Sequence, residues 1–453
     1  MPAAFLSRES TIAPLDFDRI EVPPAALAVH LSVGQAYALS TFNLPLQHLI
    51  GITHSAPGDW TLKEVGWIFS IAIAILGLSA AVFGRWVERV GPRKAMFVSA
   101  LCFGSGFIVS AIGVHFHFLF LIYFGYGVLG GVGLGIGYIS PVSTLIKWFP
   151  DRPGMATGMA IMGFGGGALI GAPLSVLLMD HFKTATSTGV LETFVTMGVI
   201  YFMFMMIGVY AVRVPPEGWA PKGWTPPVKP QPLVTRAQVA VDQAWRTPQF
   251  WLLWVVLCVN VTAGIGVLSQ ASSMIQEIFS GRVTPSAAAG FVGLLSLFNM
   301  IGRFFWASTS DYIGRRNTYM IFFALGILLY STIPSLGHLG SIALFVAAFV
   351  IILSMYGGGF ATIPAYLRDM FGTMHVGAIH GRLLTAWSVA GVLGTNLITY
   401  FRDDQIKAGV PKAQAYSVTM YIMCALLVVG FICNFCMRPV DEKFHYRATE
   451  KKP

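Results

Sequence analysis

The sequence predicts an all-α polytopic membrane protein, with twelve transmembrane helices arranged as two pseudo-symmetric halves of six. Hydrophobic residues make up 55% of the chain and charged residues 11%, far below the roughly 25% charged residues of soluble domains. Apolar runs long enough to cross a bilayer recur about twelve times, and the two halves of the chain match each other. The runs are hydrophobic on every side, so a soluble helical bundle is a poor alternative.

The elements follow in chain order from these runs. The first 27 residues carry six charged residues and several prolines but no apolar core, so we do not expect them to be a signal peptide. The predicted spans are 28–50, 64–84, 94–113, 117–142, 154–179, 192–212, 248–276, 284–308, 317–336, 340–366, 377–401 and 414–437.

An even number of spans places both tails on one side of the membrane. The predicted loops on that side hold 22 Lys and Arg residues against 6 on the other, with Arg303 as the twenty-ninth. This bias predicts that both tails are cytoplasmic, in a multi-pass protein of the plasma membrane. The net charge of +9 follows from the same bias and from anionic lipid headgroups, and it gives no support for nucleic-acid binding. The five cysteines lie within spans, which favours small apolar fillers over disulfides or metal ligands.

We expect no metal and no cofactor, and a chain that works as a monomer in the lipid bilayer. The linker between the halves is rich in proline and basic residues. It predicts a stiff cytoplasmic connection followed by a short surface helix near Thr235–Trp245. The predicted division is an N-terminal tail (1–27), a first six-helix half (28–212), the linker (213–247), a second six-helix half (248–437) and a C-terminal tail (438–453).

A constant shift of 223 residues aligns the two halves without gaps over about eighty residues. The chain has 49 glycines, so some glycine matches are coincidences, but acidic and basic matches at the same shift indicate a duplication. Parallel repeats are typical of transporters that bind their substrate between the halves. The matched positions are Glu88 with Asp311, Gly91 with Gly314, Arg93 with Arg316, Gly135 with Gly358, Pro141 with Pro364, Gly154 with Gly377, Gly158 with Gly381 and Gly171 with Gly394.

Arg303 is a charged residue deep within an apolar run. It lies eight residues before Asp311, which is about 12 Å at the helical rise, in a hydrocarbon core of about 30 Å. A guanidinium stays protonated, and no Asp or Glu is expected at similar depth. A buried cation without a protein anion predicts an anionic substrate. The shift pairs Arg303 with Ala80 and Asn299 with Leu76, so this charge belongs to one half only.

Asn299 and Arg303 are four residues apart and therefore share one helix face. A guanidinium beside an amide can bind a carboxylate and a neighbouring hydroxyl or keto oxygen. A helix–helix hydrogen bond remains the alternative role of Asn299.

Aromatic residues in glycine-rich spans complete the predicted substrate pocket. Tyr356 and Phe360 flank three consecutive glycines in the tenth span, Tyr138 ends the glycine-rich part of the fourth, and Tyr37 lies in the first. Glycines at these places let another helix approach closely. Each aromatic by itself is more often a packing residue, but as a set facing Arg303 they predict pocket walls.

The loops after the second and eighth spans carry matched charges and turns. Gly91 and Gly314 allow tight turns, and the basic residues beside them can pair with an acid or cap a helix C-terminus. These loops resemble the signature loop of the major facilitator superfamily, which implies charges that latch a cytoplasmic gate. Plain topology determinants are the alternative for any single arginine. The candidate gate residues are Gly84, Glu88, Arg89, Gly91, Arg93, Asp311, Gly314, Arg315 and Arg316.

Four further motifs are similar to the oxalate/formate antiporter branch of that superfamily, which includes bacterial relatives of the monocarboxylate (lactate) transporters. They are TPQFWLLW from Thr247, NVTAGIG from Asn260, NMIGR from Asn299 and GTMHVGAIHG from Gly372. The resemblance covers nearly the whole chain. It implies that Arg303 binds the substrate carboxylate, that Asn299 is a pocket residue, and that the aromatics at 356, 360 and 138 line the cavity.

Three positions depart from these relatives. Trp387 stands where oxalate exchange in this branch uses a lysine as a second cation. Arg382 stands where relatives usually carry an apolar residue, about one turn inside the cytoplasmic end, which favours an interface or gate residue over a second charge in the site. Animal monocarboxylate transporters have an acidic residue where Asn299 stands, which leaves the proton route open.

Together these features predict a secondary active transporter of small monocarboxylates such as lactate and pyruvate, with proton symport and alternating access. Its partners are a small organic anion and protons or a counter-anion. An oxalate/formate-type antiporter and a non-transporting carboxylate sensor are the alternatives. An enzyme is not expected, because no deep Asp, Glu or His is predicted near Arg303. Of ten histidines only His48 and His380 are expected near a membrane pathway, so the proton is expected to enter with the acid or through water.

Overall fold

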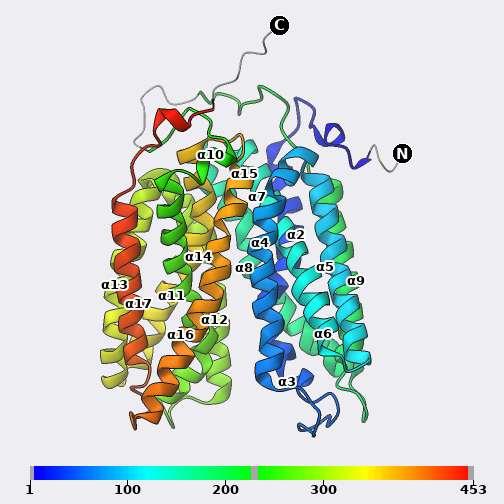
Figure 1. Ribbon diagram of the computed structural model, residues 1–453, viewed down its shortest axis with the longest axis vertical. Helices are drawn as coiled ribbons and strands as arrows, with labels where there is room; N and C mark the ends of the chain where they lie inside the picture. The colour runs from blue at the N-terminus through cyan, green and yellow to red at the C-terminus, as the bar shows by residue number, and fades with distance from the viewer. Residues whose placement is uncertain (1–4, 226–232, 447–453) are drawn as a thin grey trace.

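The computed structural model describes residues 5–225 and 233–446, and the described chain is almost entirely helical (Figure 1). The first half contains η1 (Glu9–Thr11), η2 (Arg19–Glu21), α2 (Val22–Val33), η3 (Gly34–Phe42), α3 (Asn43–Leu46), α4 (Leu62–Val90), α5 (Pro92–His115), α6 (Leu119–Ile122), η4 (Tyr123–Gly130), α7 (Gly131–Trp148), α8 (Pro153–Phe182) and α9 (Val190–Ala211). The second half contains α10 (Val241–Ala244), α11 (Pro248–Ile278), α12 (Pro285–Ile313), α13 (Arg315–His338), α14 (Ile342–Phe371), α15 (Val376–Leu383), α16 (Thr385–Lys407), α17 (Ser417–Phe435) and η5 (Glu442–Phe444).

Eleven helical stretches within the described residues are long and apolar enough to cross a membrane. They match the last eleven predicted spans, with α6, η4 and α7 forming one stretch and α15 and α16 another. The twelfth is the first span, which is divided into the consecutive pieces α2, η3 and α3. The predicted class, an all-α polytopic protein of two six-helix halves, is confirmed.

The first span begins and ends earlier than the predicted range 28–50. Pro23 and Pro24 lie in the first turn of α2, where a proline removes no helical hydrogen bond, so they belong to the helix rather than to the tail. The middle piece, η3, is a 3-10 helix that starts at Gly34. A Cβ on Gly34 would lie 2.4 Å from the Phe164 carbonyl oxygen of α8, so the two backbones meet there without side chains between them.

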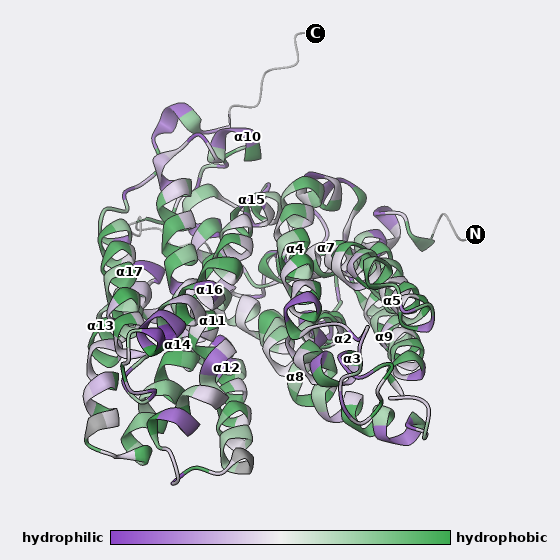
Figure 2. Cartoon of the chain, turned by 60° about the horizontal axis from the view of Figure 1, so that its bottom comes forward, coloured by the Kyte–Doolittle hydropathy of each residue, from purple (hydrophilic) through white to green (hydrophobic). Residues whose placement is uncertain are grey.

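The two halves stand side by side with their helices roughly parallel (Figure 1). Both ends of the described chain and α10 lie at one end of the helices, the top of Figure 1, which we call the termini face; the other end is the opposite face. The helices of the two halves converge toward the termini face and diverge toward the opposite face. Figure 2 shows hydrophobic residues along the long helices, with hydrophilic residues mainly at helix ends and connections.

Contacts between the halves repeat the internal symmetry of the sequence. Helix α12 packs against α8, and α4 packs against α15 and α16. A Cβ on Gly158 of α8 would lie 3.0 Å from the Arg303 carbonyl oxygen, and a Cβ on Gly381 of α15 would lie 2.2 Å from the Ala80 carbonyl oxygen. These two crossings are related by the same shift of 223 residues that relates the sequences of the halves.

The predicted surface helix near Thr235–Trp245 is wrong over most of its length. Only α10 is helical, while Thr235 and Val239 donate backbone hydrogen bonds to the carbonyls of Asp369 and Phe371, at 2.7 Å and 2.9 Å. The end of α14 thus offers acceptors that hold this stretch of linker in a non-helical conformation, and tertiary contacts override its local preference.

Candidate functional site

Arg303 lies on α12 at the contact between the halves and is fully buried. Its Nε donates to the Asn299 Oδ1 at 3.2 Å, and its Nη1 donates to the Ile161 carbonyl of α8 at 3.4 Å. Its Nη2 has no hydrogen-bond partner, and no carboxylate pairs with Arg303 within the described parts of the chain. The guanidinium lies over the rings of Phe360 and Phe164, 5.3 Å and 5.9 Å from their centroids. The side chain is therefore held in place but keeps a donor available.

Aromatic rings from both halves surround this cation. Trp387 of α16 contacts Phe360 of α14, Phe164 of α8 and Tyr138 of α7, with centroid distances of 4.6, 5.3 and 5.5 Å. Tyr37 of η3 contacts the Phe164 ring edge-on at 5.2 Å. Five separate segments of the chain thus contribute one ring each to a compact cluster next to Arg303.

The remaining predicted pocket residue, Tyr356, completes the cluster. Its hydroxyl lies 3.4 Å from the Tyr37 hydroxyl, across the contact between the halves, and its ring meets Phe360 edge-on at 5.4 Å. Tyr37 and Tyr138 also lie close enough to Arg303 to interact with its guanidinium. The structure therefore brings all six predicted site residues together, and it adds Phe164 and Trp387 to them.

Glycines create the space that this arrangement needs. A Cβ on Gly165 would lie 2.8 Å from the Arg303 Nε, and a Cβ on Gly357 would lie 2.1 Å from the Asn299 carbonyl oxygen. Either addition would force the α12 side chains or backbone to move. The first of the three consecutive glycines in α14 is thus required for the close approach of α14 to α12 that the sequence predicts.

Several buried polar atoms in this region have no hydrogen-bond partner among the residues that the structure describes. They are the Tyr138 hydroxyl, the Trp387 Nε1, the Arg303 Nη2 and both ring nitrogens of His380. A buried polar atom without a partner costs about 1–3 kcal/mol, so a cluster of such atoms is typical of a site that a polar ligand or water completes. Most of these atoms are hydrogen-bond donors, and donors are the groups that bind an anion.

The prediction for the histidines needs correction. His30 of α2, which the sequence did not single out, is fully buried and stacks on Tyr138 with a centroid distance of 5.4 Å. His380 of α15 contacts the same tyrosine ring, with a centroid distance of 5.8 Å. His48 lies just after α3, and no ring contact joins it to this cluster within the described chain. The statement that no deep histidine lies near Arg303 is therefore wrong, because the apolar setting of His30 in sequence gave no sign of the tyrosine beside it.

The signature loops place two carboxylates on helix N-termini of the opposite half. Glu88 of α4 accepts the backbone N–H of Gly377 at 3.1 Å, in the first turn of α15. Asp311 of α12 accepts the N–H groups of Gly154 and Met155, both at 2.8 Å, in the first turn of α8. A carboxylate is favoured at a helix N-terminus by unpaired N–H groups and by the helix dipole. We call the two contacts the Glu88 latch and the Asp311 latch.

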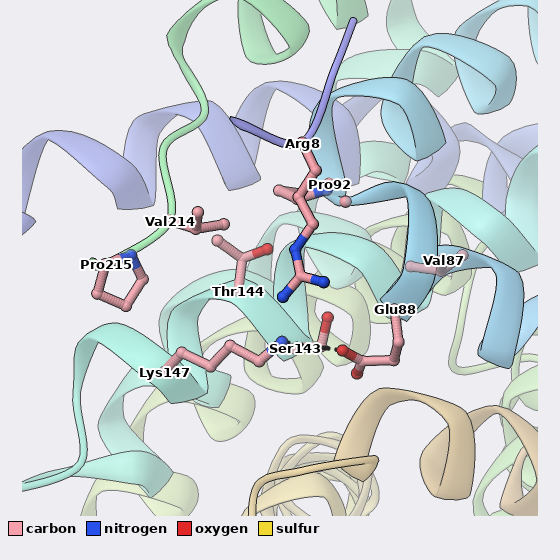
Figure 3. A pocket seen from close by; sticks show the side chains of 10 residues that line it. Arg8, Val87, Glu88, Pro92, Ser143, Thr144, Lys147, Val214 and Pro215 are labelled. Carbon is pink, nitrogen blue, oxygen red and sulfur yellow. Dashed lines mark hydrogen bonds and ion pairs between the residues drawn. The ribbon is translucent and has the colours of Figure 1, made fainter. Parts of the chain in front are cut away.

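Figure 3 shows the surroundings of the Glu88 latch. Lys147 of α7 donates to the Glu88 carboxylate at 2.9 Å. These two side chains line a small pocket, and the Arg8 side chain extends into it from the N-terminal segment. His375, just before α15, accepts the Val241 N–H at 3.4 Å. Burial holds the pKa of His375 below its ordinary value, although the charge of Glu88 acts in the opposite direction, and a neutral ring suits this acceptor role.

The other predicted gate residues have distinct positions. Arg315 binds Asp311 at 2.5 Å and Asp369 at 3.2 Å, which ties the Asp311 latch to α14. Arg93 is buried and donates to the carbonyls of Phe5, Ser10, Val209 and Val212, so it fastens the N-terminal segment to the end of α9.

The remaining gate candidates make turns or simple contacts. Gly91 and Gly314 have φ of 85° and 86°, which glycine adopts without strain. Gly84 lies against Ala378, Arg316 donates to the Phe435 carbonyl at 2.5 Å, and Arg89 is exposed.

Arg382 lies away from the aromatic cluster. Its guanidinium donates to the Val241 carbonyl at 2.8 Å and to the Asp242 carboxylate at 3.0 Å, and it lies 5.5 Å from the Trp245 ring. Asp242 also pairs with Arg85 of α4. A single acid on α10 therefore bridges basic residues from the two halves at the termini face, and we call this contact the α10 clasp.

Among the described residues, no group of three or more His, Cys, Asp or Glu side chains is placed to hold a metal ion. Side-chain hydrogen bonds also join the halves near this site. The Ser388 hydroxyl donates to the carbonyls of Ile73 and Ala74 at 3.1 and 3.2 Å, and the Thr157 hydroxyl donates to that of Ala361 at 2.7 Å. The arrangement is that of two bundles joined at one end around a buried cation.

Comparisons with known proteins agree with this architecture. The chain is 28% identical over 375 residues to the oxalate:formate antiporter of Oxalobacter formigenes, covering 82% of each chain. It is 23% identical to the apicoplast pyruvate carrier 1 of Toxoplasma gondii, covering 86% of this chain and 78% of the carrier. The structure of the fucose:proton symporter FucP of E. coli superposes with a TM-score of 0.66 at 13% identity, covering 91% of this chain and 98% of FucP.

The family comparison covers most of the chain. The sequence model of the Major Facilitator Superfamily matches residues 26–395, from within α2 to within α16, which include both signature loops and the Arg303 site. The protein belongs to the major facilitator superfamily and is a multi-pass membrane transporter.

Proposed function

We propose that the protein is a secondary active transporter of small monocarboxylates of the lactate and pyruvate type, and that Arg303 binds the substrate carboxylate. The observation that carries this proposal is the unpaired Nη2 of a fully buried guanidinium. Asn299 and Tyr138 supply polar groups beside it for a 2-hydroxy or 2-oxo oxygen. The names of the two relatives, an oxalate:formate antiporter and a pyruvate carrier, support small carboxylates as the substrate class.

Charge balance favours a monocarboxylate over a dicarboxylate. One fixed cation balances one carboxylate, whereas a dianion would leave an unpaired charge in a region of low dielectric constant, at a cost on the order of several kcal/mol. Arg382 is engaged by α10 and so supports no second anion position. Trp387, an uncharged side chain, stands in the cluster itself.

The orientation follows from the basic residues and the latches. We propose that the termini face is cytoplasmic, in a bacterial inner membrane, because it carries most of the Lys and Arg residues. The two latches then close the cytoplasmic side, and the halves rock about the Arg303 site so that opening one side closes the other. The chain works as a monomer in this scheme, because both halves of the site come from one chain.

The test is transport by purified protein in proteoliposomes. Labelled lactate should enter, and unlabelled lactate and pyruvate should compete far better than oxalate or malonate. If no monocarboxylate enters the proteoliposomes or competes with lactate, the proposal is contradicted.

An oxalate/formate-type exchanger is the second candidate, favoured by the name of the Oxalobacter relative. It predicts that uptake is indifferent to a pH gradient and accelerates when an anion is preloaded on the opposite side. In that case the symport assignment fails, while the role of Arg303 is retained.

A further inference from the structure

His30 has a hydrogen-bonding environment that suits its protonated form. Its Nδ1 lies 2.7 Å from the Ala160 carbonyl oxygen of α8, and its Nε2 lies 3.1 Å from the Tyr138 carbonyl oxygen of α7. Carbonyl oxygens only accept hydrogen bonds, and a neutral imidazole has only one N–H. In the neutral ring one nitrogen lone pair must therefore face an oxygen, whereas an imidazolium donates to both.

The sequence of α7 adds a further acceptor to this environment. Pro141 lies within α7 and has no N–H, so the Gly137 carbonyl, four residues earlier, loses its helical donor. That carbonyl also lies near the His30 ring. A fully buried ring among three carbonyl oxygens is a site for a positive charge, held by backbone dipoles rather than by a carboxylate.

His380 provides the contrast. It is equally buried and contacts the same tyrosine ring as His30, but neither of its nitrogens has a hydrogen-bond partner in the described part of the chain. An imidazolium there would leave two donors unsatisfied, so a proton is better placed on His30. The titratable or charged side chains beside His30 are Arg303 from α12, the stacked ring of Tyr138 from α7 and His380 from α15, while α8 contributes the Ala160 carbonyl.

Arg303 opposes a second positive charge at His30 when the site is empty, because like charges nearby disfavour the charged form. A carboxylate bound to Arg303 neutralises that repulsion. The affinity of His30 for a proton then rises with substrate binding, and by reciprocity the proton raises the affinity for substrate.

We propose that His30 is the proton-binding residue of the transport cycle, loaded when a monocarboxylate occupies Arg303 and released when the carboxylate leaves. One proton and one carboxylate enter together from one side and leave together on the other. This inference rests on the proposed function and replaces the simpler scheme in which no residue holds the proton.

The first experiment measures proton uptake on lactate binding in weakly buffered solution with a pH-sensitive dye, at pH values from about 5 to 8. Wild-type protein should take up protons, at most about one for each lactate bound. His30→Gln should bind lactate without proton uptake, and the control His48→Gln, at a histidine outside the aromatic cluster, should behave like wild type. Lactate binding without proton uptake by wild type, or unchanged uptake by His30→Gln, would overturn the proposal.

The second experiment separates coupling from transport in proteoliposomes. His30→Gln should lose the stimulation of lactate uptake by an inward proton gradient and retain lactate–lactate counterflow, which needs no net proton movement. Arg303→Ala should lose both activities. If the wild-type protein transports no lactate at all, the proposed function itself is wrong, and this result is distinct from a failure of His30→Gln to lose coupling.

If the His30 variants do not fold, the wild-type protein still decides the question. With 15N-labelled histidine at pH about 8, where exposed histidines are neutral, saturating lactate should convert one buried ring into an imidazolium with two hydrogen-bonded nitrogens. Histidine rings that all stay neutral would contradict the proposal.

Discussion

At the termini face, Glu88 and Asp311 accept backbone N–H groups at the starts of α15 and α8, in two contacts related by the internal repeat. At mid-depth, Arg303 of α12 has only Ala80 as its counterpart in α4. The backbone is symmetric even there, because Gly381 faces the Ala80 carbonyl as Gly158 faces that of Arg303. The repeat is broken by the side chain alone.

The difference separates two requirements. Latches must hold two equivalent halves and release them together, so equal contacts on both sides serve that purpose. A substrate the size of lactate lacks the symmetry of the protein, so a single cation in one half is enough. The aromatic pair Phe164 and Trp387, related by the same shift and 5.3 Å apart, shows an intermediate case in which ring character is kept and ring size is changed.

The largest expected effect comes from removing the asymmetric charge. Arg303→Ala should abolish lactate uptake in proteoliposomes. Arg303→Lys keeps the charge but loses the planar fork, so uptake should fall about tenfold to a hundredfold. The control is Arg438→Ala, an exposed arginine outside the site and the signature loops, which should transport normally. Uptake near the wild-type level by a correctly inserted Arg303→Ala would show that the substrate carboxylate does not bind at Arg303.

The next effect tests the symmetric backbone crossings. Gly381→Ala should destabilise the protein more than Gly158→Ala, because the added Cβ would lie 2.2 Å rather than 3.0 Å from a carbonyl oxygen. Overpacking of this kind costs about 1–3 kcal/mol, so the melting temperature in detergent should drop further for the variant at 381. Equal melting temperatures would show that α15 can move away from α4 freely.

The latches should have smaller and similar effects. Glu88→Gln and Asp311→Asn each remove a charge at a helix N-terminus, worth about 0.3–2 kcal/mol, and should shift the protein toward a form open at the termini face. Reaction of a cysteine introduced at Ala378, which is buried against Gly84, should become faster in each variant and fastest in the double variant. An effect in only one variant would show that the latches are not equivalent.

The smallest expected effect is at the α10 clasp. Arg382→Ala removes the bonds to Val241 and Asp242 and leaves the aromatic cluster intact. Transport rates should change about twofold or less, as for a partly exposed ion pair worth about 1 kcal/mol or less, and the preference for lactate over oxalate should be unchanged. Strong oxalate competition in wild type that disappears in Arg382→Ala would place this arginine in the site instead.

Hydropathy, charge bias and the 223-residue shift determined the fold class, the spans and the matched loops from sequence alone. These properties follow from the membrane as solvent, which requires long apolar helices and penalises a buried charge wherever it occurs. For the same reason Arg303 stood out without any structural information. The early start of the first span was misjudged, because prolines that begin a helix look in sequence like tail residues.

Only the tertiary structure decided which side chains meet. Phe164, Trp387 and His30 come from three different helices, and their contacts with Tyr138 and with one another depend on helix rotation and crossing, which apolar runs do not encode. The position of Arg382 was likewise set by α10, a short helix that packs against α15. Sequence fixes which residues are in the membrane and which are charged, and packing decides which of them share a site.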